Sequence, residues 1–371
     1  MGFQFQAVAA LSSSVIADFS IDYAQLGLLI GLYLFPGIVI AYPGGLLGRN
    51  FGDKRIAVFG LALMVAGGLL TASGEYPAVL TGRLISGVGA VLLNVLVTKM
   101  IMDWFADREI GTALAVLVAS WPVGIGIALI VLPGLAAHSS AAAGFACTAG
   151  VAAVVLVLLV ALYRVPPAAI GARPAGKEPS RLSRREFGLV SLAGSVWMLF
   201  NAGYILVVSY GPALLVSNGS SQSNAGFTTS LVAWALIITV PLGGVLIDRI
   251  GYATAAMVAS FIVFGVSAML VPAAPSPALM AFIGVVAGLP VGAMMVLPSE
   301  VLRPQNRAAG MGVFYTWYYA GMALLTPAAG ILRDTSGAPG VPLLFAGALE
   351  FAALVVLVLL RLYQRNFATA R

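Results

Sequence analysis

The chain has 371 residues, of which 61% are hydrophobic and only 9% are charged, and its formal net charge is +6. A soluble domain contains roughly 25% charged residues, so this composition excludes a water-soluble globular protein and indicates a chain that spans a membrane. The single cysteine, Cys147, excludes a disulfide framework and a cluster of cysteine metal ligands.

Expected membrane-spanning helices follow one another along the whole chain. Such a helix needs about 20 mostly apolar residues. Twelve stretches fit this requirement: 3–19, 24–47, 55–73, 77–101, 108–132, 141–163, 186–209, 224–247, 253–272, 276–298, 308–331 and 341–362. We therefore predict an all-α membrane protein. The first stretch is short, which leaves two expectations open: a start codon assigned late, or a trimmed chain.

One polar segment divides these stretches into two sets of six. Residues 164–185 contain four prolines and several basic residues, whereas most other connections are very short. Short connections make neighbouring helices pack as antiparallel hairpins. We predict an N-terminal six-helix bundle over residues 1–163, a linker over 164–185, and a C-terminal six-helix bundle over 186–371.

The lysines and arginines are distributed on one side of the expected membrane. If the N-terminus lies inside, all of the 19 basic residues except Arg83 and Arg333 face the same side. Short cytoplasmic loops of membrane proteins carry such an excess. We therefore predict that both termini and the linker are cytoplasmic, in a bacterial inner membrane. Topology and contact with anionic lipid explain the net charge, and we expect no nucleic-acid partner.

An internal repeat relates the two halves. Residues 244–251 read G-x-x-x-D-R-x-G, and residues 45–52, which precede them by 199 positions (244 − 45), keep both terminal glycines. A further motif, R-x-x-x-G-x-G, covers residues 83–89. Together these motifs resemble the signatures of the major facilitator superfamily of secondary transporters. The resemblance implies a fold of two six-helix bundles, one central site, alternating access and no cofactor.

The repeated loop is the expected gate. The resemblance implies that the Asp248 carboxylate binds the start of the fifth helix near Arg108 and latches the two halves together. A helix N-terminus attracts such a carboxylate. Three further residues complete this copy of the motif: Gly244, Arg249 and Gly251. A tight turn that ends on a charge is the structural alternative.

The first copy of the loop departs from the family pattern. Arg49 stands where the family has Asp, and an arginine cannot cap a helix N-terminus. We therefore expect the latch at Gly45, Arg49 and Gly52 to be weaker or to bind a different partner, with Glu300 as a candidate.

Candidate substrate contacts are polar or amphipathic side chains within the expected spans. The resemblance places helices one, four, seven and ten around the cavity, with helix eleven close by. Trp197, Asn201 and Tyr204 share one helical face by their spacing. The full set of candidates is Arg83, Asn94, Trp121, Trp197, Asn201, Tyr204, Tyr315 and Trp317. Packing of aromatic side chains is the alternative function of this set.

Trp121 belongs to a segment, Ser120 to Gly126, that is similar to the G-P-x-x-G motif of antiporters, with Trp121 in place of the glycine before the proline. A packing kink at Pro122 is the structural alternative, because proline removes a backbone hydrogen bond.

Two charged residues lie away from the ends of expected spans. An unpaired charge at the depth of Arg83 costs about 2.5–3.5 kcal/mol by insertion scales. Arg83 therefore either snorkels outward or bonds helix carbonyls, or it faces a watery cavity that attracts anions. Glu350 is the only acid near the middle of a span. Burial disfavours the charged form of a carboxyl, which makes Glu350 a candidate proton carrier, with a neutral structural acid as the alternative.

The loop after the fourth helix adds a looser resemblance. Residues 103–109 contain W-F-x-x-R-E, which looks like cyanate- and nitrate-type members. The nitrate pattern needs an arginine on helices two and eight, and residues 24–47 and 224–247 contain none. Nitrate is therefore set aside.

We predict a monomeric secondary transporter, not an enzyme. Its expected cargo is a small polar or anionic organic solute, moved in symport or antiport with protons or by solute exchange. Efflux of amphipathic drugs is the alternative within transport, and a non-transporting receptor is the alternative outside it. The sequence contains no nucleotide loop, metal cluster or nucleophile–base pair, so no cofactor or metal is expected.

Overall fold

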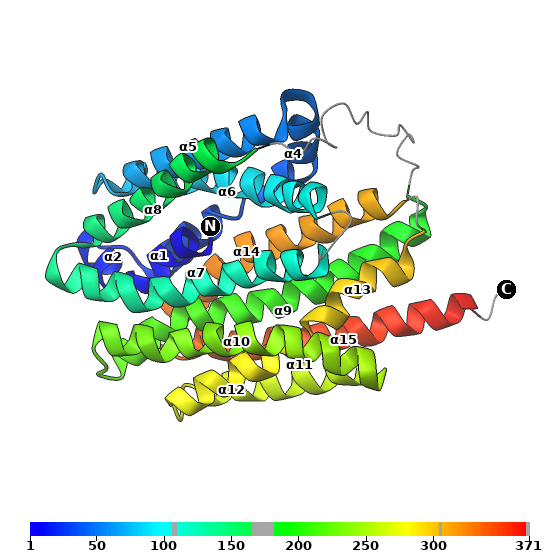
Figure 1. Ribbon diagram of the computed structural model, residues 1–371. Helices are drawn as coiled ribbons and strands as arrows, with labels where there is room; N and C mark the ends of the chain where they lie inside the picture. Colours follow the sequence, from blue (N-terminus) through cyan, green and yellow to red (C-terminus); the bar gives the residue numbers. More distant parts are fainter. Residues whose placement is uncertain (106–109, 165–181, 304–305, 369–371) are drawn as a thin grey trace.

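The computed structural model describes residues 1–105, 110–164, 182–303 and 306–368, which form α-helices joined by turns. The helices run side by side along one direction (Figure 1). Their bounds in the first half are α1 (Gly2–Ala10), α2 (Ser12–Phe19), α3 (Tyr23–Leu32), α4 (Gly37–Phe51), α5 (Asp53–Thr71), α6 (Tyr76–Trp104), α7 (Ile110–His138) and α8 (Ala141–Leu162). In the second half they are α9 (Arg184–Ser217), α10 (Gln222–Ile250), α11 (Ala253–Leu270), α12 (Pro277–Gly288), α13 (Val291–Val301), α14 (Arg307–Ser336) and α15 (Val341–Ala368).

Three of the membrane crossings each consist of two shorter helices that meet near the middle of the crossing. The pairs α1–α2, α3–α4 and α12–α13 each make one crossing, so the described helices give twelve crossings. Pro36 and Pro290 stand directly before α4 and α13, and a proline removes one backbone donor from the helical ladder. Ten crossings in the described chain are long and apolar enough to span a membrane. The prediction of an all-α membrane protein with twelve helices in two bundles is confirmed.

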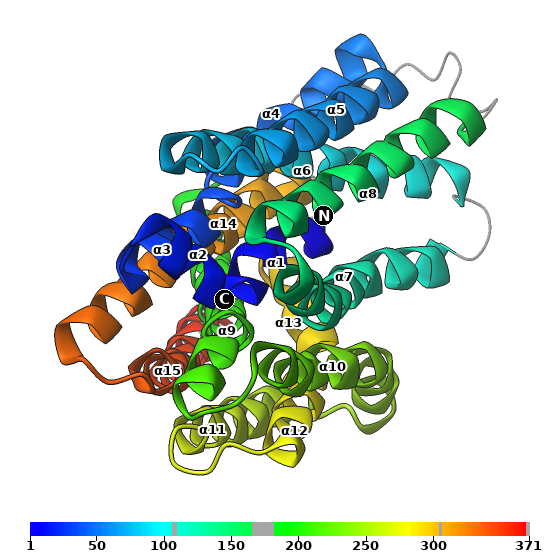
Figure 2. The same cartoon turned by 90° about the vertical axis from the view of Figure 1, so that its left-hand side faces the viewer.

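Each half packs around its own central helices. In the first half, α5 lies against both α6 and α8, and α1 lies along α7. In the second half, α9 lies between α14 and α15, and α10 packs on α12. Figure 2 shows α4, α5, α6 and α8 gathered on one side and α10, α11, α12 and α15 on the other.

Two seams join the halves: α3 runs along α14, and α7 runs along α10. Both partners in the first seam approach closely because glycines face the other backbone. A Cβ on Gly27 would lie 2.6 Å from the carbonyl oxygen of Thr326, and one on Gly31 would lie 2.6 Å from that of Ala323. Small residues allow this contact between helices in lipid.

Basic side chains gather at one end of the bundle, which we call the basic end. Its members lie near the ends of helices, or just beyond them: Lys54, Arg55, Lys99, Arg164, Arg184, Arg249, Arg303 and Arg361. In Figure 1 this end is on the right, where α15 terminates. We call the other end the opposite end; there, α3 begins and α14 terminates.

Candidate functional site

An aromatic cluster occupies the contact between α9 and α14. The Trp197 ring stacks on the rings of Phe314 and Tyr318, with centroid distances of 6.1 and 6.2 Å. Tyr315 meets Tyr318 edge-on at 6.3 Å. We define the aromatic cluster as Trp197, Phe200, Phe314, Tyr315, Tyr318 and Tyr319. The structure thus brings together two of the candidate residues from different helices, Trp197 and Tyr315.

Tyr319 connects the aromatic cluster to the first half. Its side chain shares a hydrogen bond with Asn94 of α6. Its ring also packs against Gly37 at the start of α4, where a Cβ would clash with ring atoms. The candidate Asn94 therefore lies at the boundary between the halves, next to the cluster.

Four buried polar atoms on α9 have no hydrogen-bond partner among the described residues, and two of them belong to candidate residues: the Trp197 Nε1 and the Tyr204 hydroxyl. Buried polar groups are normally paired, and an unpaired one costs roughly 1–3 kcal/mol. Asn201, which lies between them, is different because its Nδ2 donates to the carbonyl oxygen of Trp197 at 2.8 Å. A bound solute or water would satisfy the two free groups.

The structure places Trp121 and Trp317 outside this constellation. The Trp121 ring lies 5.6 Å from the Phe5 ring, so it belongs to the contact of α7 with α1. Trp317 packs on Gly194 of α9 and keeps 39% of its surface exposed.

Arg83 is buried, with 2% of its surface exposed, and it binds backbone carbonyls of two neighbouring helices. Its Nε donates to Leu29 of α3 at 2.9 Å, and its Nη1 and Nη2 donate to Gln4 and Phe5 of α1 at 2.9 and 3.1 Å. The guanidinium carbon also lies 4.5 Å from the centre of the Tyr33 ring. Arg83 thus ties α6 to α1 and α3.

This arrangement corrects one expectation about the first helix. The expected span over residues 3–19, with the N-terminus inside, would place Gln4 at the cytoplasmic end of its helix, far from Arg83. In the structure α1 begins near the middle of the bundle (Figure 1), at the level of Arg83. Gln4 also donates to the carbonyl oxygen of Met64, and Gln6 donates across the halves to that of Val208 at 2.7 Å.

The opposite end is sealed by a carboxylate from α14. Asp334 accepts hydrogen bonds from the backbone N–H groups of Tyr23 at 3.1 Å and Ala24 at 2.7 Å, the first two residues of α3. Asp22 caps the same helix by accepting from the N–H of Gln25 at 2.7 Å. The unpaired donors that every helix start presents are thus bound by both halves of the protein.

Two further side chains close this end. Arg333 stacks on the Tyr23 ring, 3.4 Å from its centre, which is a cation–π contact between halves. The Tyr210 hydroxyl of α9 donates to the carbonyl oxygen of Thr326 at 2.9 Å and lies 3.4 Å from that of Tyr23. Sequence reasoning missed Asp334 and Tyr210; the first stands in the last turn of a helix, a position with no motif to reveal its partner.

At the basic end, the ion pairs described stay within one half. Lys99 pairs with Asp53 and, at 3.7 Å, with Asp103. Glu300, the candidate partner for the first-half loop, pairs instead with Arg361 at 2.5 Å. The side chain of Arg49 lies outside the described residues, so the wiring of this loop stays a prediction.

Glu186 organises the start of the second half. It forms a capping box with Ser183 and accepts from Arg303 at 3.1 Å and from Asn306 at 2.8 Å. The hydrogen bond to Glu186 raises the pKa of Arg303 above its ordinary value.

The predicted gate residues are only partly described. Gly52 and Gly251 adopt positive φ angles of 92° and 75°, which end α4 and α10 in turns that favour glycine. Gly244 faces open space, and Arg249 is exposed. Gly45 lies within α4, whereas the side chains of Arg49 and Asp248 and the whole of Arg108 lie outside the described part of the chain.

Glu350 is fully buried among α9, α11 and α15. Both carboxyl oxygens lack a hydrogen-bond partner in the described chain. Gly203 and Gly265 face it, and a Cβ on Gly203 would clash with its Oε1. A charge with no partner in such a place is expensive, so this carboxyl suits a group that carries a proton.

Comparison with known proteins identifies the family. The model of the Major Facilitator Superfamily matches residues 1–217 and 192–369, which together cover nearly the whole chain. The chain belongs to this superfamily. Its members are transporters rather than enzymes, so the prediction of a membrane transporter is confirmed, whereas the looser likeness of residues 103–109 to cyanate-type members stays a prediction.

Relatives within the superfamily differ in their cargo. The chain is 27% identical to the 3-(3-hydroxy-phenyl)propionate transporter of Escherichia coli over 260 residues, which are 67% of this chain and 62% of that protein. It is 24% identical to the lysosomal dipeptide transporter MFSD1 of Danio rerio, with 95% and 81% of the two chains covered.

Solved structures share the superfamily fold. The D-xylose-proton symporter matches with a TM-score of 0.77 at 17% identity, and the nucleoside transporter NupG with 0.74 at 17%. The matches cover 96% of this chain and, respectively, 93% and 96% of those proteins.

Replacing Arg83 tests its structural role. We expect Arg83→Lys to lower the free energy of unfolding by roughly 2 kcal/mol, because one ammonium cannot reach carbonyls on both α1 and α3 in the way a planar guanidinium does. Thermal unfolding of purified protein measures this. Arg55→Lys, an exposed change at the basic end, is the control. An unchanged melting temperature in Arg83→Lys would contradict the role.

Proposed function

We propose that this protein moves a small polar or anionic organic solute across the membrane by alternating access of one site between its two halves. The observation that carries the proposal is the pair of unpartnered groups at Trp197 and Tyr204 beside the aromatic cluster. An N–H and an O–H that are buried without partners suit a solute with acceptor oxygens. The aromatic rings supply apolar walls, a combination typical of small-molecule sites.

The superfamily relatives support this chemistry without fixing the cargo. One is named for 3-(3-hydroxy-phenyl)propionate, which combines an aromatic ring with a carboxylate. Aromatic walls and hydrogen-bond donors are complementary to both parts of such a molecule. The Asn94 side chain reaches the cluster from the first half, so both halves would contribute a side chain next to the solute.

We also propose an orientation. The basic end faces the cytoplasm, because cytoplasmic loops carry the excess of lysine and arginine. The bundles over residues 1–163 and 186–371 are then the two moving bodies, and the linker 164–185 is cytoplasmic. Asp334 seals the external side, so this conformation is closed to the outside and the site is reached from the cytoplasm.

Proton coupling through Glu350 completes the proposal. The carboxyl is buried in the same half as Trp197 and Tyr204, and it faces Gly203 of α9, the residue next to Tyr204. A shift of α9 during alternating access would change the surroundings of both groups. Binding or release of a proton at Glu350 is thereby linked to the state of the site.

The first test removes the two hydrogen-bonding groups. Trp197→Phe and Tyr204→Phe are each expected to raise the apparent KM for uptake of 3-(3-hydroxyphenyl)propionate into proteoliposomes about tenfold, because a polar contact with a charged solute is lost. Trp104→Phe, whose Nε1 donates to Arg164 at the basic end, is the matched control. Uptake of this acid by none of the proteins, with transport of amphipathic dyes instead, would favour drug efflux.

The second test separates proton coupling from substrate binding. We expect Glu350→Gln to abolish accumulation driven by a proton gradient, because the amide carries no titratable proton, while exchange between internal and external solute persists. Proteoliposomes with and without an imposed pH gradient measure both activities. Gradient-driven accumulation by Glu350→Gln at the wild-type level would make Glu350 a structural acid.

A further inference from the structure

We propose that Gln6 is a positioning residue for transport, because its side chain stabilises the closed opposite end by binding a backbone carbonyl that Pro212 leaves free on α9. Gln6 lies on α1 in the first half, and its Nε2 donates to the carbonyl oxygen of Val208 in the second half at 2.7 Å. Both residues are fully buried. The proposal rests on the alternating access proposed above, but not on the identity of the solute.

The acceptor is free because of the sequence of α9. In an α-helix each carbonyl accepts from the N–H group four residues further on. Pro212 lies inside α9, four residues after Val208, and a proline has no N–H to donate. Neighbouring helices in a membrane protein satisfy carbonyls that a proline frees in this way. Here the donor comes from the other half, so this carbonyl is bound by Gln6 only while α1 lies against α9.

The donor is fixed to the first half. Arg83 Nη1 and Nη2 donate to the carbonyl oxygens of Gln4 and Phe5, the two residues before Gln6. Gln6 therefore moves together with α6. Its Oε1 is buried and has no partner among the described residues. Separation of α1 from α9 would let water bind this oxygen, the Nε2 and the freed carbonyl, so the contact can open without leaving its groups unpaired.

The two seams between the halves show the same use of proline. At the α7–α10 seam, Pro133 leaves the carbonyl of Leu129 without its helical donor, and a Cβ on Gly226 would clash with that oxygen. At the α3–α14 seam, Pro327 does the same for the carbonyl of Ala323, which faces a glycine of α3. A glycine offers such an oxygen only a weak Cα–H contact, whereas Gln6 offers an N–H that a substitution can remove.

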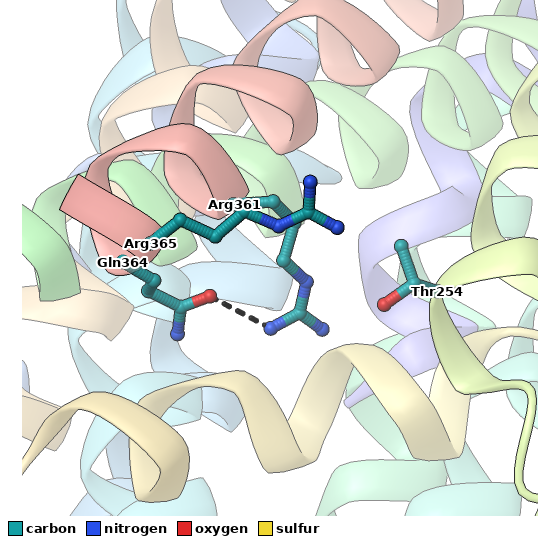
Figure 3. Close-up of a pocket in the computed structure, with 4 residues that line it drawn as sticks. All are labelled: Thr254, Arg361, Gln364 and Arg365. Carbon is teal, nitrogen blue, oxygen red and sulfur yellow. Dashed lines mark hydrogen bonds between the residues drawn. The ribbon is translucent and has the colours of Figure 1, made fainter. Parts of the chain in front are cut away.

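The Gln6 contact lies between the aromatic cluster and the opposite end. Val208 follows Tyr204 by four residues and shares its face of α9, in the direction of the opposite end. At the basic end the corresponding side-chain bonds in the described chain stay within one half. Arg361 Nη1, for example, donates to Gln364 of the same helix at 2.9 Å (Figure 3). Opening of the opposite end therefore has to break the Gln6 bond, whereas opening of the basic end leaves it intact.

A double-mutant cycle tests the pairing. Spin labels replace Ser73 and Ala274 at the opposite end of the full-length protein, in a Cys147→Ala background and in lipid nanodiscs. Gln6→Met has nearly the same size but no donor, so we expect it to raise the population with an open opposite end about fivefold. Pro212→Ala restores an N–H that satisfies the same carbonyl within α9. In the Pro212→Ala background, Gln6→Met should change the open population by less than about 1.5-fold.

Two further variants control for misfolding and for the loss of a buried amide. Gln4→Met is the matched control, because Gln4 lies on the same helix but donates to Met64 within the first half, and it should change the open population by less than about 1.5-fold. Gln6→Asn keeps the amide but is one methylene shorter, and it should raise the open population about twofold or more.

Two results would contradict the proposal in distinguishable ways. Equal effects of Gln6→Met in the Pro212 and Pro212→Ala backgrounds, or no effect in either, would overturn the pairing of Gln6 with the freed carbonyl. A single closed distance in every variant, Asp334→Asn included, would overturn the alternating access on which the proposal rests.

Discussion

The hydrogen bonds from the start of α3 to Asp334 are the interaction on which this conformation depends. Two backbone donors of a helix in the first half are bound by a carboxylate in the second. A carboxylate at an exposed helix N-terminus contributes about 0.3–1 kcal/mol. That magnitude suits a contact that must open during transport, because a stronger bond would trap one state. The glycines of the α3–α14 seam provide the close approach that this contact needs.

The two ends of the bundle are built differently. At the opposite end, Asp334, Arg333 and Tyr210 connect the halves. At the basic end, the ion pairs of Lys99, Glu186 and Arg361 in the described residues each join helices of one half. Each half is therefore internally fixed at the basic end while the halves are held together at the other. This division is what rigid-body rocking about a central site requires.

The sequence predicted the fold well because hydropathy and charge act locally along the chain. The twelve apolar stretches were sufficient to predict the membrane crossings. The one-sided distribution of lysine and arginine was sufficient to predict the basic end. The site was harder to predict because its contacts join distant residues. Arg83 satisfies carbonyls on α1 and α3, and Asn94 meets Tyr319, yet neither pairing has a spacing signal. The position of α1 along the membrane normal was predicted wrongly, because hydropathy identifies a spanning segment but does not fix its depth in the membrane.

Distances between spin labels across both ends test the central claim that Asp334 holds the opposite end closed. One label pair replaces Ser73 and Ala274 at the opposite end, and a second replaces Arg55 and Tyr252 at the basic end. In Asp334→Asn we expect the open population at the opposite end to rise up to about fivefold, with a matching approach of the second pair, whereas Asp18→Asn at the same end leaves both unchanged. Identical distance distributions for Asp334→Asn and the unsubstituted protein would contradict the account.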